Sequence, residues 1–292
     1  MNALSIPVSN NKILVTGVSG NVGKKVSLLL HSAGISHYGF ARDPQAVSET
    51  GCQHIFAGDY ADGAALDIAL QGINTLFLVS ISGKPFDRAR QQCNVIDSAV
   101  RNKVDRIIYL SFMSASATSS FPYSADHLLT EAHLRQSGVS YVILRDSFYM
   151  DLIPDMANTS GQVKGPGGDG KVGWVSRLDV CRAACRVIAD PLIINRTFNL
   201  TGPELLSLEE AISQLQFLGL QISWCEETMA EARAWRLATG ASEWEVDVWL
   251  GSYEAMGSGE LSSLSNDILK LTGREPISLR EYFSNLRPSL NG

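Results

Sequence analysis

The sequence predicts an α/β fold, a doubly wound parallel sheet (Rossmann) with a smaller, mostly helical C-terminal lobe. Short β-rich runs alternate with stretches of helical periodicity through roughly the first half of the 292 residues, and the pattern then loosens. A glycine-rich turn follows the first β-rich run. Strands and helices that alternate in this way form parallel βαβ units with right-handed crossovers and helices on both faces of the sheet.

Six apolar runs in this part of the chain are predicted strands, and the run TLFLVS is typical of a buried strand. The predicted strands are residues 12–15, 38–41, 54–57, 75–80, 106–111 and 141–144. Between them, apolar residues recur at helical spacing, and Asp62 stands where an N-cap is needed. The predicted helices are residues 22–33, 64–70, 87–102 and 125–137.

Beyond residue 150 the sequence predicts further elements around a glycine-rich segment. Residues 161–173 contain six glycines and a proline, which favours a loop or a hairpin over a helix. Helical patterns follow at 178–189, 204–219, 228–239 and 242–258, with a strand at 196–200. No linker separates two lobes, so we expect them to be interleaved in sequence.

Composition and charge exclude several classes of function. The 24 Lys and Arg against 30 Asp and Glu give a net charge of −6, which argues against sequence-independent binding of nucleic acid. No apolar stretch approaches the ~20 residues that a membrane span needs. The N-terminus lacks a basic start followed by a long apolar run, so neither a signal peptide nor a membrane partner is expected.

The five cysteines indicate a reduced, cytoplasmic protein. They are scattered at positions 52, 93, 181, 185 and 225, with no CxxC pair and no His/Cys cluster, so we expect no metal. Cys181 and Cys185 are four residues apart on a predicted helix. They are either packing thiols or a redox pair.

The glycine loop after the first strand has the spacing GxxGxxG, with glycines at Gly17, Gly20 and Gly23. The first permits a tight turn, the second lets the backbone approach a pyrophosphate, and the third lets the helix pack closely on the sheet. The loop follows a strand and opens a helix, which is the context of a dinucleotide site. The predicted contacts are Thr16, Gly17, Ser19, Gly20, Asn21, Val22 and Gly23. The alternative is a tight turn without a ligand.

The end of the second strand favours NADP(H) over NAD(H). An arginine there accepts the 2′-phosphate of NADP, whereas an acidic residue bonds the ribose hydroxyl of NAD. Arg42 stands directly at the strand end, and its planar guanidinium suits a phosphate. The alternative for Arg42 is a solvated surface arginine.

Three further residues at strand ends are candidate cofactor contacts, since ligands bind outside the carboxyl ends of parallel strands. Asp59 follows the third strand and either reaches the adenine edge or caps the next helix. Ser80 ends the fourth strand, and Ser111 ends the fifth.

With these motifs, the chain resembles the NmrA-like branch of the atypical short-chain dehydrogenase/reductases. Within that branch it is most similar to the NAD(P)H:quinone oxidoreductases and triphenylmethane reductases. The segments that carry the resemblance are ILVTGVSGNVG at 13–23, ARDP at 41–44, GDY at 58–60, NVIDSAV at 94–100, HLLTEAHLRQSGVSYVILRDSFY at 127–149, GDGKVGWVSRLDV at 168–180, TGPELLSLEEA at 201–211 and the tail at 253–283.

The resemblance implies a Rossmann domain and a smaller lobe, with NADPH in the cleft between them. We therefore expect residues 1–155, with 176–200 returning to them, to form the NADP-binding domain. Residues 156–175 and 201–292 form the expected substrate-binding lobe. Homodimers are common in such families, and nothing in the residues shows an interface.

The candidate catalytic residues are Tyr123 and His127. Ordinary short-chain dehydrogenases carry Tyr-x-x-x-Lys, in which the tyrosine protonates the substrate. Here His127 replaces the lysine, and Tyr123, which follows Pro122, is expected to precede the helix rather than lie in it. His127 either orients the ribose or donates to the acceptor, or it is a histidine at the helix N-terminus that bonds a neighbouring backbone group. Glu131, one turn later, either partners His127 or caps and solvates the helix.

Candidate substrate contacts follow the sixth strand. Asp146 stands where the family usually has asparagine, and a charge retained there would favour a cationic acceptor. Phe148, Tyr149 and Met150 leave the sheet at its ligand edge, although at least one of them should pack in the core. Trp174 ends the glycine-rich loop and is a further candidate wall.

The leading hypothesis is an NADPH-dependent oxidoreductase that reduces a small electrophilic acceptor: a quinone, a cationic aromatic compound or an iminium. Such acceptors need a hydride more than a proton donor, so the missing Tyr/Lys pair suits this chemistry. The alternative is a non-catalytic NADP(H) sensor that binds a partner protein. An imine reductase of biosynthesis is a third hypothesis.

Overall fold

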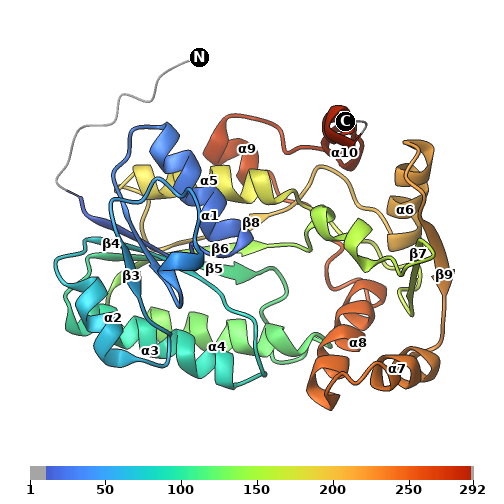
Figure 1. Cartoon of the computed structure of the whole chain (residues 1–292), viewed down its shortest axis with the longest axis horizontal. Coiled ribbons are helices and arrows are strands. Elements are labelled where there is room, and N and C mark those ends of the chain that lie inside the picture. The colour runs from blue at the N-terminus through green and yellow to red at the C-terminus, as the bar shows by residue number, and fades with distance from the viewer. Residues whose placement is uncertain (1–10, 291–292) are drawn as a thin grey trace. The chain divides into compact units, whose positions relative to one another are not determined.

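The structure is a computed structural model that describes residues 11–290, and it divides into two compact units (Figure 1). The first unit contains residues 11–111, 129–144 and 181–198. The second unit contains residues 112–128, 145–180 and 199–290. The chain therefore passes between the units several times, and each is described separately below.

A seven-stranded sheet with the order β3-β2-β1-β4-β5-β6-β8 organises the first unit (Figure 1). Neighbouring strands from β1 to β5 pair in parallel. The strands are β1 (Ile13–Thr16), β2 (Tyr38–Ala41), β3 (Ile55–Ala57), β4 (Thr75–Val79), β5 (Arg106–Phe112), β6 (Ser140–Asp146) and β8 (Arg196–Leu200). The chain winds outward from β1 to β3 and resumes at β4 beside β1, so the expected doubly wound sheet is confirmed. The switch point lies between β1 and β4.

Helices cover both faces of this sheet, because each crossover between parallel strands requires one. They are α1 (Asn21–Ser32), α2 (Gly63–Leu70), α3 (Asp87–Arg101), α4 (Pro122–Gln136) and α5 (Arg177–Ala189). On one face, α5 packs on α1, and the thiols of Cys181 and Cys185 donate to the carbonyls of Val22 and Val26. These two cysteines are free, and burial raises the pKa of the Cys185 thiol, as expected for packing thiols.

The first unit has an apolar core between the sheet and α2, α3 and the later part of α4. Every residue of β1 is buried, because parallel strands are covered on both faces. The core is formed by the buried residues Leu14, Phe40, Leu66, Leu70, Leu76, Leu78, Val95, Ile96, Ile107, Tyr109, Leu134 and Ile143, among others.

The second unit combines a small two-stranded sheet with helices. Its strands β7 (Gln162–Gly165) and β9 (Ser223–Glu226) pair in parallel. Its helices are α6 (Leu208–Phe217), α7 (Met229–Ala238), α8 (Glu243–Gly257), α9 (Asp267–Thr272) and α10 (Leu279–Leu290), with single 3-10 turns at Pro44–Ala46 in the first unit and at Met150–Leu152 and Pro154–Met156 in the second. Capping boxes begin α6, α7 and α8, in which Ser207, Thr228 and Ser242 each bond a glutamate three residues later.

Three expectations from the sequence need correction. Helix α4 begins at Pro122, so Tyr123 lies in its first turn, because proline fits the first turn of a helix well. Helix α6 begins four residues later than expected, where Ser207 and Glu210 form the cap. The glycine-rich segment is not a simple hairpin, since its strand β7 pairs in parallel with the distant β9. Strand β9 and helices α9 and α10 had no periodic signal strong enough to predict them.

Among the helices of residues 11–290, none has the length and apolar character required to cross a membrane.

The tightest contact in the first unit tests the role of Gly23. A Cβ at this position would overlap the Gly17 carbonyl and lie 2.8 Å from the Thr16 oxygen, which are rigid backbone atoms. We expect Gly23→Ala to lower the free energy of unfolding by ~1–3 kcal/mol, although alanine ordinarily favours a helix. Urea denaturation measures this, and the exposed Lys25→Ala is the control, expected to stay within ~0.5 kcal/mol of wild type. An unchanged Gly23→Ala protein would show that the helix can shift away.

Candidate cofactor and acceptor site

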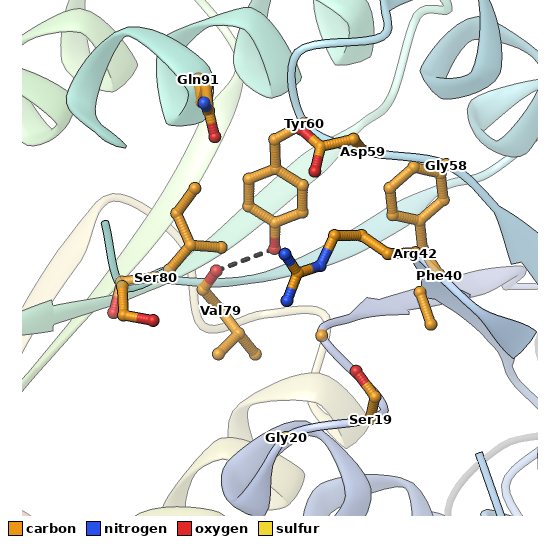
Figure 2. A pocket seen from close by; sticks show the side chains of 14 residues that line it. Ser19, Gly20, Phe40, Arg42, Gly58, Asp59, Tyr60, Val79, Ser80 and Gln91 are labelled. Atoms are coloured by element: carbon orange, nitrogen blue, oxygen red, sulfur yellow. Dashed lines mark hydrogen bonds between the residues drawn. The ribbon is translucent and has the colours of Figure 1, made fainter. Parts of the chain in front are cut away.

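A pocket of about 280 Å³ lies in the first unit at the switch point between β1 and β4, where ligands of doubly wound sheets bind (Figure 2). Its walls come from the glycine loop, the ends of β2, β3 and β4, and α3. The residues that line it are Gly17, Ser19, Gly20, Phe40, Ala41, Arg42, Gly58, Asp59, Tyr60, Val79, Ser80, Ile81, Ser82 and Gln91.

The glycine loop presents uncapped backbone amides to this pocket. Gly17 has a φ of +63°, which favours glycine, and its carbonyl accepts the amide of Gly20 at 2.9 Å. Gly20 is the N-cap of α1 and supplies no capping side chain, and the first turn of α1, which holds Asn21, Val22 and Gly23, contains no acidic residue. Helix α2, in contrast, is capped by the Asp62 carboxylate. The exposed amides and the dipole of α1 can therefore bind an anion.

Thr16 supports the loop from behind. Its side chain is fully buried, and its hydroxyl donates to the Phe77 carbonyl at 3.2 Å and accepts the Val79 amide at 3.0 Å. The Tyr60 hydroxyl lies 2.5 Å from the Thr16 oxygen and 2.8 Å from the Val79 carbonyl. Burial raises the pKa of Tyr60, so this hydroxyl keeps its proton. Thr16 therefore does not line the pocket, but its hydrogen bonds hold the residues that do.

Arg42 and Asp59 both face the pocket (Figure 2). Across the described part of the chain, the Arg42 guanidinium forms no hydrogen bond or ion pair, so it can bind an anionic ligand. The Asp59 carboxylate accepts the Ala61 amide at 2.9 Å, and Asp62 rather than Asp59 caps α2. Ser80 lies on the opposite wall from these two side chains, at the end of β4.

The segment that follows Ser80 is held by buried side chains of α3. The Arg88 Nε donates to the Ile81 carbonyl at 2.7 Å, and the Gln92 Oε1 accepts the Ile81 amide at 3.3 Å. The Gln92 Nε2 donates in turn to the Thr130 hydroxyl at 3.0 Å. Because Gln92 is fully buried, this wall of the pocket depends on an internal hydrogen-bond chain.

Ser111 lies away from the pocket lining and is bonded to Glu131. Its hydroxyl donates to the Glu131 Oε1 at 2.7 Å, and Arg135 donates to the other carboxylate oxygen at 2.9 Å. Glu131 is fully buried, so the expectation of a capping or solvated glutamate is wrong. A buried carboxylate must be hydrogen-bonded and paired with a cation, and Ser111 and Arg135 satisfy both needs.

In the second unit, Tyr123 and His127 lie one turn apart on α4 beside an aromatic cluster. The His127 ring is 6.2 Å from Phe112, and the Tyr123 ring is 5.4 Å from Phe121. Phe148 packs against both phenylalanines, at 5.0 and 5.5 Å. His127 is only 5 % exposed, whereas Tyr123 and Phe148 are half-buried.

Met150 and Trp174 belong to the core of the second unit. Met150 is fully buried, which agrees with the expectation that one residue after β6 packs inward. Trp174 is buried, its indole Nε1 donates to the Leu206 carbonyl at 3.1 Å, and its ring lies 6.3 Å from Phe148. Trp174 therefore stabilises the position of Phe148.

Asp146, the last residue of β6, is buried and accepts a hydrogen bond from the Tyr149 hydroxyl. Burial raises the pKa of this carboxyl to about 7, although the Tyr149 hydrogen bond and the Arg177 charge oppose the rise. Both the protonated and the ionised form of this carboxyl are therefore accessible near neutral pH.

Comparison with known proteins identifies the family of this site. A family model described as NAD(P)H-binding matches residues 17–191, which is more than half of the chain. The chain belongs to the NAD(P)H-binding family. Together with the relatives below, this match confirms the resemblance to NmrA-like reductases and makes the protein an NAD(P)H-dependent oxidoreductase.

Relatives of this oxidoreductase match along nearly the whole chain. Quinone oxidoreductase 2 of Escherichia coli is 30% identical over 282 residues, which cover 94% of this chain and 98% of the relative. The crystal structure of the NADPH-dependent quinone oxidoreductase of Escherichia coli with NADPH superposes with a TM-score of 0.83, over 94% of this chain and 99% of that chain, at 30% identity. The triphenylmethane reductase of Citrobacter shares the fold, with a TM-score of 0.81 at 24% identity, over 94% and 99% of the two chains.

Several residues of the oxidoreductase pocket were missed by the sequence analysis. Tyr60 and Gln91 line the pocket, and Arg88 and Gln92 hold its wall. The GDY motif contained Tyr60, but nothing in the sequence indicated that its hydroxyl bonds Thr16. The hydrogen-bond chain from Ile81 through Gln92 to Thr130 had one sequence signal, which is a polar residue on the buried face of a predicted helix.

The hydrogen bond between Gln92 and the Ile81 amide can be tested by replacing Gln92. Replacing it with leucine keeps the volume but leaves the Ile81 amide and the Thr130 hydroxyl without these partners, which costs ~1–3 kcal/mol. We expect Gln92→Leu to weaken NADPH binding several-fold, measured by titrating NADPH fluorescence. The control is Arg90→Ala on the exposed face of α3, which should bind NADPH as wild type does. Wild-type affinity in Gln92→Leu would mean that the wall does not depend on this chain of bonds.

Proposed function

We propose that this oxidoreductase uses NADPH in preference to NADH to reduce a small electrophilic acceptor, a quinone, a cationic aromatic compound or an iminium, without a Tyr/Lys acid pair. The observation that carries the proposal is the Arg42 guanidinium in the pocket beside the uncapped N-terminus of α1. The full-length similarity to a quinone oxidoreductase supports the reductase over a sensor protein.

The first unit fits the nucleotide part of NAD(P)H. The amides at the start of α1 and the Ser19 hydroxyl suit a pyrophosphate, and Gly20 leaves room for close approach. Asp59 has a carboxylate oxygen that suits the exocyclic amine of an adenine. When bound, NAD(P)H supplies a hydride to the acceptor.

Arg42 supports a preference for the phosphorylated cofactor. A guanidinium binds a phosphate through two charge-assisted hydrogen bonds, whereas a ribose hydroxyl gives one weaker bond. Within residues 11–290, no carboxylate forms an ion pair with Arg42. Its charge is therefore best compensated by a phosphate.

Tyr123 and His127 are the residues proposed to contact the acceptor. Both lie on one face of α4, since residues four apart on a helix are neighbours. Phe148 provides an aromatic surface close by, at 5.0 Å from Phe112. Since position 127 is histidine rather than lysine, we propose that these residues orient a flat acceptor and that no Tyr/Lys pair protonates it.

Arg42 gives the first test. We expect Arg42→Ala to weaken NADPH binding about tenfold to a hundredfold, since a charged hydrogen-bonded pair is worth ~1.5–3 kcal/mol. NADH binding should change little. Fluorescence titration of both cofactors measures this, with the exposed Arg90→Ala as the control. Equal NADPH affinity in wild type and Arg42→Ala would remove the assignment.

Consumption of NADPH by the purified protein tests the reaction. The acceptor panel contains a benzoquinone, a naphthoquinone, a triphenylmethane dye and a cyclic iminium, with NADH alongside. We expect turnover with at least one class, a preference for NADPH, and a loss of about tenfold or more in kcat/KM in His127→Ala.

Two results would contradict the proposal. Tight NADPH binding without turnover of any acceptor would favour the sensor hypothesis. Wild-type turnover in His127→Ala would remove the role of that residue.

A further inference from the structure

At the end of β6 lies a buried carboxyl that accepts a hydrogen bond from a phenol. Asp146 is 6 % exposed, and the Tyr149 hydroxyl donates to its Oδ2 atom. Tyr149 is half-buried, so it connects the carboxyl to the surface of the second unit. The Arg177 guanidinium stacks over the Tyr149 ring, 5.1 Å from its centroid. An acid buried in this way has two accessible charge states, since burial disfavours its ionised form.

A pair of opposite charges, Arg177 and Asp151, lies near the Asp146–Tyr149 pair. Arg177, at the start of α5, faces the carboxylate of Asp151 at 4.0 Å. Asp151 also accepts the Arg177 amide and the hydroxyl of Tyr282 from α10. Burial beside Asp151 raises the pKa of Tyr282, which stays neutral. Within the group of Asp146, Asp151 and Arg177, ionisation of Asp146 changes the summed charge from zero to −1.

We infer that the Asp146–Tyr149 pair sorts acceptors by charge, since its protonated form supplies a proton to neutral acceptors and its ionised form binds cationic ones. The inference rests on the proposed function and names the acceptor class for each state of the pair. Tyr149 is the group that contacts the acceptor. Asp146 acts through it as a positioning and proton-holding residue.

A neutral acceptor uses the protonated pair. A quinone that has accepted a hydride carries one negative charge on oxygen and needs one proton to become the hydroquinone. In the protonated pair the Asp146 O–H donates to the Tyr149 oxygen, which leaves the phenol proton free for the product. The Tyr149 O–H bond breaks as the new O–H bond forms on the product, and the Asp146 proton moves to the phenol oxygen. The Asp146 carboxylate then takes up one proton from the solvent, which is the proton that the overall reduction consumes. No electrons move in this step, and the atoms balance.

A cationic acceptor uses the ionised pair. A dye cation or an iminium that has accepted a hydride is already neutral and takes no proton. Its positive charge is attracted by the Asp146 carboxylate, and in a partly buried site that attraction is screened less than in water. Because burial places the pKa of Asp146 near 7, both forms exist around neutral pH.

Equilibrium binding of a triphenylmethane dye without cofactor tests the charge selection. We expect the dissociation constant of the wild-type protein to fall about tenfold between about pH 6 and about pH 8.5 as Asp146 ionises. Asp146→Asn should bind the dye with no such pH dependence and with the weaker affinity throughout. The exposed Asp155→Asn is the matched control and should keep the wild-type profile.

Thermal stability gives a readout that needs no ligand. The pKa of Asp146 is raised on folding, so its contribution is complete below the unfolded pKa of ~4 and is lost as the pH rises through about 7. We expect the melting temperature of wild type to fall relative to that of Asp146→Asn over this interval. A constant difference would show that Asp146 does not titrate there.

Turnover completes the test. For a benzoquinone, kcat/KM of wild type should fall above about pH 7, by up to about tenfold per pH unit. For the dye it should rise through the same range. Asp146→Asn should remove both slopes, and Tyr149→Phe should slow the quinone at every pH and spare the dye.

The outcomes separate the inference from the proposed function. Slopes of the same sign for both acceptors, or wild-type dye binding in Asp146→Asn, overturn the inference while the reductase stands. Dye binding that follows Asp146 as expected, without turnover of either acceptor, supports the charge selection and removes the reductase activity.

Discussion

The hydrogen bonds of the Thr16 side chain are the interaction on which the nucleotide pocket depends. One hydroxyl at the end of β1 joins the Phe77 carbonyl, the Val79 amide and the Tyr60 phenol, and so ties β1, β4 and the segment after β3 together. Because Thr16 is fully buried, each of these polar groups needs its partner. The glycine loop begins at the next residue, and its turn is therefore anchored to the switch point of the sheet.

In the second unit, the most notable feature is a group of ionisable side chains rather than a set of fixed backbone hydrogen bonds. Asp146, Tyr149, Arg177, Asp151 and Tyr282 form a connected group at the end of β6. In the first unit the buried Glu131 has Ser111 and Arg135 on its two oxygens and remains paired. Burial raises the pKa of the Asp146 carboxyl to about 7, and the hydrogen bond from the Tyr149 phenol opposes this rise only in part.

Local patterns predicted the elements of the first unit, because each strand and helix there has a strong period of its own. The strand at Tyr38–Ala41 and the Asp62 cap, for example, agree with the structure. Long-range pairings had no such signal: β7 pairs with β9 across about sixty residues of sequence. The placement of Arg42 at a strand end brought it to the pocket, whereas the burial of Glu131 and the raised pKa of Asp146 depend on neighbours that only the fold supplies.

The packing of α5 on α1 has a consequence for the proposed reduction of quinones. Quinones add covalently to thiolates, so every reactive cysteine is a point of self-inactivation. Cys181 is fully buried, burial raises the pKa of Cys185, and the pKa of Cys93 is raised to about 11 by burial and by Asp97. The raised pKa keeps Cys93 and Cys185 as thiols at neutral pH, and full burial shields Cys181 from an electrophile. Arylation would therefore be directed to Cys52 and Cys225, both of which are only partly buried.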